Sequence, residues 1–141
     1  MRRSDLYLAD TSAWLRVFPT RAPPSELRRR LDELLASRQM TITGMVRLEI
    51  LGALSNEAEY RRRAALLDAV PVLPTTEARW AEAAWLGSQL RARGLTIPNT
   101  DLLIAAVAMA ASATVVHVDR HFDLMAQHTP LLVESYVSLR P

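Results

Sequence analysis

The stretch LYLADTS, residues 6–12, decides how this chain folds. It is a short apolar run that ends abruptly on one carboxylate and two hydroxyls. About five apolar residues are too few to span a membrane as a helix, but they suit a buried strand. In open α/β sheets, ligands bind just beyond the carboxyl ends of the strands. Asp10 is predicted to stand at such an end.

Asp10 has two interpretations. A charged group at that place costs several kcal/mol unless it is paired or bound to a metal, which indicates a functional carboxylate. Alternatively, Asp10 caps a helix that begins near Ser12, because Asp, Thr and Ser are all good N-caps. Both interpretations stay open on this stretch alone, and the rest of the chain has to separate them.

Length and composition restrict the class of protein. With 141 residues, of which 50% are hydrophobic, we expect one domain, residues 1–141, with a proper core. The absence of cysteine excludes disulfides and cysteine-ligated zinc. Asp10 interrupts the first apolar run before a signal peptide of normal length forms, and no stretch reaches about 18 apolar residues. We therefore expect a soluble cytoplasmic protein with no membrane partner.

The basic residues are all arginine, 17 in number, and the formal net charge is +2. If four acids hold a metal, 17 Arg face the 11 remaining acids, which leaves +6. The planar guanidinium suits phosphate recognition. The triplets Arg28–Arg30 and Arg61–Arg63 are either solvated helix faces or a patch that faces nucleic acid. A GC-rich genome is the plain explanation for the missing lysine, but not for this clustering.

Strand and helix patterns alternate along the chain, which indicates a parallel sheet with crossover helices, an α/β fold. Residues 71–74 lie between prolines and are either a short edge strand or a linker. Residues 20–24 are predicted to form a loop. Strands are predicted at 6–9, 39–43, 114–118 and 131–133, and helices at 12–17, 25–37, 45–54, 57–69, 75–93, 102–111 and 120–127.

Glu49 is unusual because its predicted helical neighbours, Met45, Val46, Gly52 and Ala53, are all apolar or small. An ordinary solvated glutamate would have polar neighbours at these positions. The pattern favours a functional carboxylate on a face that ought to be buried.

Asp101 and Asp119 occupy similar settings. Asp101 stands at the first turn of a helix whose next ten residues are all apolar, as in a helix buried on every side. A favourable interaction with the helix dipole would explain it, but Asn99 and Thr100 already offer caps there. Asp119 ends the clearest strand and repeats the arrangement at Asp10.

Four carboxylates cannot share a pocket without neutralisation, because like charges a few ångströms apart favour protonation. A hard divalent cation such as Mg²⁺ or Mn²⁺, which prefers oxygen ligands, is the simplest partner. His117, His121 and His128 lack zinc-binding spacing and are interpreted as bystanders, with His121 the nearest to a substrate.

Four segments together, in this order, resemble a PIN-domain ribonuclease of the VapC type, the toxin half of a bacterial toxin–antitoxin pair. They are residues 8–12, 47–51, 99–106 and 118–122, and they span nearly the whole chain. The resemblance implies a PIN-like three-layer α/β/α sandwich with a central parallel sheet of four to five strands. It also implies cleavage of RNA that depends on Mg²⁺ or Mn²⁺, a homodimer, and inhibition by a cognate antitoxin.

The resemblance also assigns residues. Asp10 and Asp101 are expected to bind the metal directly, while Glu49 and Asp119 hold metal-bound waters or a second cation, or orient the attacking water. The family often has an Asp where this chain has His121, and Asp123 follows Phe122, so the role of Asp123 as a fifth acid stays open. The catalytic residues implied are Asp10, Glu49, Asp101 and Asp119, and the supporting ones are Thr11, Ser12, Asn99 and Asp123.

Other classes fit less well. A phosphoryl-accepting receiver domain needs a lysine, and an aspartate-nucleophile phosphatase expects a second Asp two residues after the first; neither is present. A non-catalytic PIN-like module that binds protein or RNA is the remaining alternative, and the four acids argue against it. The apolar residues Trp14, Leu15 and Phe18 could serve the core, a dimer interface or an antitoxin groove.

Overall fold

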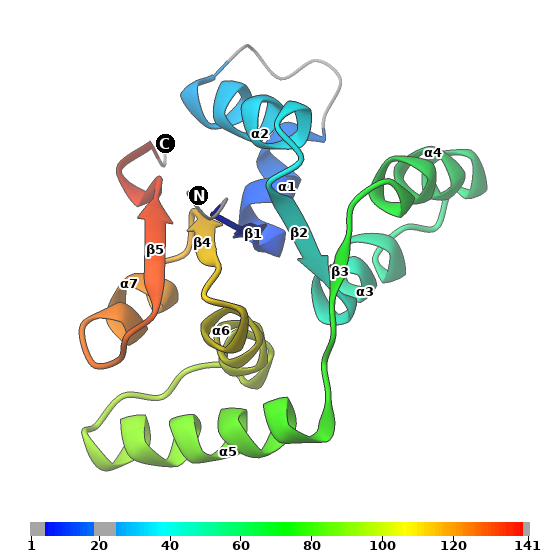
Figure 1. Cartoon of the computed structure of the whole chain (residues 1–141). Helices are drawn as coiled ribbons and strands as arrows, with labels where there is room; N and C mark the ends of the chain where they lie inside the picture. The colour runs from blue at the N-terminus through cyan, green and yellow to red at the C-terminus, as the bar shows by residue number, and fades with distance from the viewer. Residues whose placement is uncertain (1–4, 19–24, 140–141) are drawn as a thin grey trace.

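The computed structural model describes residues 5–18 and 25–139. Its centre is a parallel sheet of five strands in the order β3-β2-β1-β4-β5 (Figure 1). The predicted loop at residues 20–24 lies outside the described residues. The strands are β1 Tyr7–Ala9, β2 Met40–Thr43, β3 Val72–Leu73, β4 Thr114–His117 and β5 Leu132–Ser135.

Strand β1 occupies the middle of the sheet. Leu8 pairs with Thr41 on one side and with Val115 on the other, and both Leu8 and Ala9 are fully buried. The chain extends the sheet first on the β2 side and then on the β4 side, so β1 and β4 meet at a topological switch point. In sheets of this kind ligands bind in the crevice at that point, beyond the carboxyl ends of the strands.

Seven α-helices of the described residues flank the sheet, with a short 3₁₀ turn at Val137–Leu139. This agrees with the expected three-layer α/β/α architecture. In Figure 1, α5 lies alongside α6, which is itself buried from Asp101 to Ala108. The helices are α1 Thr11–Val17, α2 Glu26–Ala36, α3 Gly44–Gly52, α4 Glu57–Asp68, α5 Glu77–Ala92, α6 Asn99–Ala111 and α7 Arg120–Ala126.

Helix caps explain several boundaries. The side chains of Ser25, Thr43 and Asn56 accept hydrogen bonds from backbone N–H groups three residues on, so they cap α2, α3 and α4. Gly94, with φ +80°, follows α5 in the left-handed conformation that glycine adopts without strain. These local signals define helix boundaries that hydrophobic periodicity alone does not define.

The structure differs from the sequence-based expectations in some details. The segment between Pro71 and Pro74 is an edge strand, β3, rather than a linker. Helix α5 begins after Thr76, not Thr75, and α3 ends at Gly52, two residues earlier than expected. Leu66 and Trp80 are large apolar residues, yet they are 45% and 53% exposed, because α4 and α5 lie at the outside of the fold. No helix in the described ranges is both long and apolar enough to cross a bilayer.

Candidate active site

Asp10 both caps a helix and lies at the end of a central strand. Its Oδ1 accepts a hydrogen bond of 2.6 Å from the Ser12 hydroxyl and one of 3.3 Å from the backbone N–H of Ala13, at the start of α1. The residue is only 3% exposed. The capping interpretation is therefore correct, but it does not exclude the functional one, because the carboxylate remains buried at the switch point.

Thr11 and Ser12 each fix one acid. The Thr11 hydroxyl donates to Glu49 Oε1 at 2.8 Å and so joins α1 to α3. The Ser12 hydroxyl donates to Asp10 while it accepts from the backbone N–H of Val118 at 2.9 Å, which joins the end of β1 to the end of β4. Each of these two hydroxyls thus contacts one of the predicted site acids.

Asp101, Asp119 and His121 form the tightest polar group. His121 Nδ1 lies 3.2 Å from Asp101 Oδ2 and 3.1 Å from Asp119 Oδ1. One potential ligand atom from each of the three lies within 4.8 Å of the other two, a spacing that can hold a metal ion. Among the described residues, Asp10 and Glu49 do not belong to this closest group.

The pKa values show that the acids influence one another. Burial raises the pKa of Asp10 to about 7, and the charge of Asp101 adds to this effect. Burial also raises the pKa of Asp101 to about 6, with further contributions from the charges of Asp119 and Glu49. All four acids therefore share one electrostatic neighbourhood that lacks an equal positive charge. Such a set of oxygen donors fits a hard divalent cation.

Asp123, the uncertain fifth acid, has structural partners. Its Oδ2 accepts from the Ser135 hydroxyl at 2.9 Å, and its Oδ1 lies 3.1 Å from His117 Nε2, although that contact is not aligned as a hydrogen bond. His117 is fully buried, and burial lowers its pKa, so its Nδ1 accepts from the backbone N–H of Asp119 at 3.1 Å. Asp123 thus ties α7 to β5, and His117 holds Asp119 in place, a role that the sequence did not indicate.

Comparison with known proteins shows the family of this chain. A family model described as PIN domain matches residues 7–127. This chain belongs to the PIN-domain family. It is 32% identical over 137 residues to VapC ribonuclease Mb1587 of Mycobacterium bovis, a match that covers 93% of this chain and 99% of the relative. It is 38% identical over 130 residues to Ribonuclease VapC2 of Mycobacterium tuberculosis, covering 87% of this chain and 86% of the relative.

A solved structure supports the fold of this PIN domain. The structure is that of VapBC2 from Rickettsia felis bound to a DNA fragment from their promoter. It matches with a TM-score of 0.75 and 20% identity, covering 93% of this chain and 98% of that one. At this identity, the match shows the fold alone.

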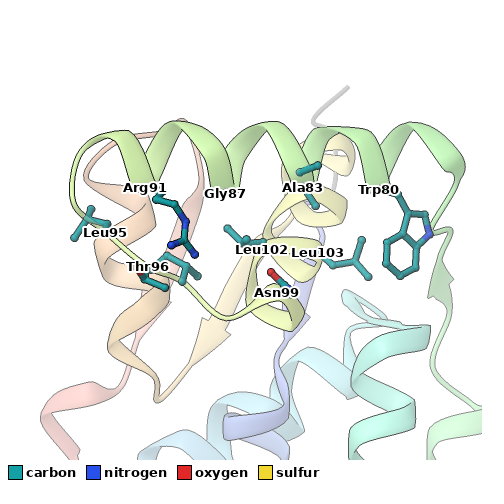
Figure 2. A pocket seen from close by; sticks show the side chains of 11 residues that line it. Trp80, Ala83, Gly87, Arg91, Leu95, Thr96, Asn99, Leu102 and Leu103 are labelled. Carbon is teal, nitrogen blue, oxygen red and sulfur yellow. The ribbon is translucent and has the colours of Figure 1, made fainter.

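Asn99 of this PIN domain lies near the acids in sequence but lines a different feature. A cavity of about 370 Å³ is enclosed by α5, the start of α6 and the segment between them (Figure 2). Trp80 and Arg91 lie toward opposite ends of this cavity along α5, and Asn99 lines it at the start of α6. Helix α6 begins after Pro98 with no side-chain cap, so Asn99 and Thr100 do not take the capping role expected for them.

The arginine triplets are largely engaged with acids. Arg30 donates to both carboxylate oxygens of Glu134, so it joins α2 to β5. In the other triplet, Arg61 pairs with Glu57, while Arg62 and Arg63 both pair with Glu59. Four of the six arginines therefore already have a carboxylate partner, and two of these four, Arg61 and Arg62, remain largely exposed on α4.

Proposed function

We propose that this PIN domain is an endoribonuclease that depends on Mg²⁺ or Mn²⁺ and acts as the toxin of a toxin–antitoxin pair. The observation that carries the proposal is the close group of Asp101, Asp119 and His121, together with the effect of the Asp101 charge on Asp10 and of the Asp119 and Glu49 charges on Asp101. The relatives named VapC ribonucleases support the same activity. The proposal includes the prediction that residues 1–141 form a single PIN domain.

The metal would be held by Asp101, with Asp119 beside it and Asp10 as the further ligand expected from the sequence. A divalent ion held there would lower the pKa of a bound water and polarise a phosphoryl oxygen. The chain's own contribution is to fix the carboxylates. Asp10 is held by Ser12, and Glu49 is held by Thr11 at 2.8 Å, where its second oxygen can orient a water.

The test is single substitution of Asp101 in the purified protein. Asp101→Asn keeps the shape and removes the charge, so we expect RNA cleavage with Mn²⁺ to fall at least about 100-fold. Asp68→Asn is the matched control, because Asp68 is an exposed acid at the end of α4 that pairs with Arg47. Circular dichroism checks that both variants fold.

Two outcomes would reject this function. Equal cleavage by wild type and Asp101→Asn would show that the acidic group around Asp101 takes no part in RNA cleavage. A wild-type protein that binds Mn²⁺ or RNA but cleaves no RNA in a fixed-time assay would instead indicate the non-catalytic binding module.

Protein partners belong to the same proposal. Leu15, Leu48 and Tyr60 are 48%, 63% and 44% exposed, and they stand on α1, α3 and α4, which pack in succession. Large apolar side chains exposed on neighbouring helices support a protein interface, which we assign to the cognate antitoxin.

Trp85, 67% exposed on α5, supports a second interface, which we assign to the homodimer. Light scattering of wild type and Trp85→Ser tests this assignment.

A further inference from the structure

We propose that the Nδ1 atom of His121 is itself a metal ligand, and that this nitrogen makes the centre prefer Mn²⁺ to Mg²⁺. The inference rests on the metal-dependent function proposed above and adds to it a residue that decides which ion is bound. It concerns the position where the family often carries an Asp.

The backbone places His121 for this role. Asp119 is the N-cap of α7, and its Oδ1 accepts the backbone N–H of His121 at 2.9 Å. This cap fixes the first turn of α7 beside the acids, so the imidazole reaches across to Asp101 on α6. The side chain is 31% exposed, and water or a substrate phosphate can therefore approach the same centre.

The distances fit one shared ion. Octahedral ligands about 2.0–2.1 Å from Mg²⁺ lie about 3.0 Å from each other, and those of larger cations lie further apart. The separations from His121 Nδ1 are 3.1 Å to Asp119 Oδ1 and 3.2 Å to Asp101 Oδ2. Both separations from Nδ1 thus match the spacing of neighbouring ligands on an ion at least as large as Mg²⁺, and one ligand atom from each of the three residues lies within 4.8 Å of the other two.

His117 provides the contrast within the chain. Its Nδ1 accepts the backbone N–H of Asp119, its Nε2 faces Asp123, and it has no exposed surface. Its Nδ1 is used by the backbone, and its Nε2 is buried on the Asp123 side of the ring. Among the histidines, His121 therefore has the nitrogen that faces two acids of the site.

The chemical consequence is a change of selectivity. Mg²⁺ takes oxygen ligands and holds its waters tightly, whereas first-row transition ions accept imidazole nitrogen readily. A site with two carboxylates and one imidazole therefore favours Mn²⁺ over Mg²⁺ more than an all-carboxylate site does. His121→Asp restores the all-oxygen set at the same position.

The experiment measures binding and coordination rather than activity. Calorimetric titration of Mn²⁺ and of Mg²⁺ into chelator-treated protein gives the ratio of the two affinities. We expect this ratio to fall at least about tenfold in His121→Asp. His128→Asp is the matched control and should leave the ratio unchanged, because His128 lies after α7 against Arg93.

Pulsed electron paramagnetic resonance of bound Mn²⁺ in protein labelled with ¹⁵N-histidine gives the second readout. We expect a directly bonded ¹⁵N coupling in wild type and in His128→Asp, and its loss in His121→Asp. If Asp101→Asn abolishes Mn²⁺ binding but wild type shows no histidine coupling, the inference is overturned and His121 only donates hydrogen bonds. The proposed ribonuclease function survives that result.

The experiments also recognise the case in which the ribonuclease function fails and the ligand assignment holds. Histidine-coupled Mn²⁺ with no cleavage of RNA would leave the ligand assignment standing and reject the ribonuclease function. Failure of wild type to bind either ion, with or without RNA present, would overturn both.

Discussion

Among the single residues, Asp10 shows that one carboxylate can cap a helix while its burial disfavours its ionised form. Two hydrogen bonds stabilise its Oδ1, yet burial outweighs them and raises its pKa from 3.8 to about 7. Because the pKa in the folded protein lies above that in the unfolded chain, ionisation of Asp10 destabilises the fold. The penalty is absent below about pH 4, grows up to about pH 7, and is complete above that pH.

Asp10→Asn should therefore stabilise the metal-free protein at alkaline pH. The amide oxygen can accept the same two hydrogen bonds, while the buried charge disappears. We expect the free energy of unfolding at pH 8 to rise by on the order of 2–4 kcal/mol, with little change at pH 4. Urea unfolding in the presence of a chelator measures both. A variant less stable than wild type at pH 8 would show that Asp10 is a structural cap first.

Thr11 and Ser12 should separate stability from activity. Ser12→Ala leaves the buried N–H of Val118 without its acceptor and should cost about 1–3 kcal/mol of unfolding free energy. Thr11→Val removes only the hydrogen bond to Glu49, so we expect near-wild-type stability and slower RNA cleavage. Thermal unfolding and a cleavage assay on both variants provide the measurements. Equal losses of stability in the two variants would contradict this division of roles.

At the scale of elements, Arg30 shows that a run of like charges can hold two distant segments together. Its guanidinium contacts both oxygens of Glu134 and lies 4.9 Å from the centre of the Tyr7 ring, so α2 is joined to the sheet at β5 and β1. The nearby carboxylate raises the pKa of Arg30 further above its already high value. The triplet's position in sequence gave no sign of this, because the partner is 104 residues away.

Arg30→Lys should weaken this connection, because an ammonium group cannot reproduce the planar two-point contact. We expect a loss of about 1–2 kcal/mol of unfolding free energy, measured by urea unfolding at low salt. Arg29→Lys is the control, since Arg29 stands exposed on the same helix. The interpretation fails if the two variants lose equal stability.

The difference between local signals and contacts distant in sequence explains which features of the elements could be predicted from sequence. Alternating patterns and caps such as Thr43 identify the strands and helices, because those signals are local. The acids at strand ends were predictable too, since parallel strands end at one edge of a sheet. The bond from Thr11 to Glu49 and the contacts of His121 depend on register and helix placement. The exposure of Trp80 depends on which helix lies outermost, and helical spacing alone cannot show this.

At the scale of the whole molecule, the charge available for RNA is smaller than composition indicates. Leaving aside the four acids of the site, 17 Arg face 11 acids. Many of these arginines are paired, however, including Arg47 with Asp68 and Arg79 with Glu82. The site itself is negative without a metal. Binding of a phosphate backbone should therefore depend on the metal and on a few arginines beside the acids, among which Arg120 directly follows Asp119.

RNA affinity should therefore depend moderately on salt. For three phosphate contacts to single-stranded RNA, the slope of log affinity against log salt is about −2, or a loss of roughly tenfold to twentyfold between 50 and 200 mM. The measurement uses Glu49→Gln, which leaves Asp101 and the bound metal in place, with a fluorescent RNA and fixed Mn²⁺, so that cleavage is slow during the measurement. Adding Arg120→Gln should lower the magnitude of the slope by about 0.7. Adding Arg61→Gln, which removes an exposed pair on α4, should not. A slope near zero would mean that base or shape contacts, rather than phosphates, hold the RNA.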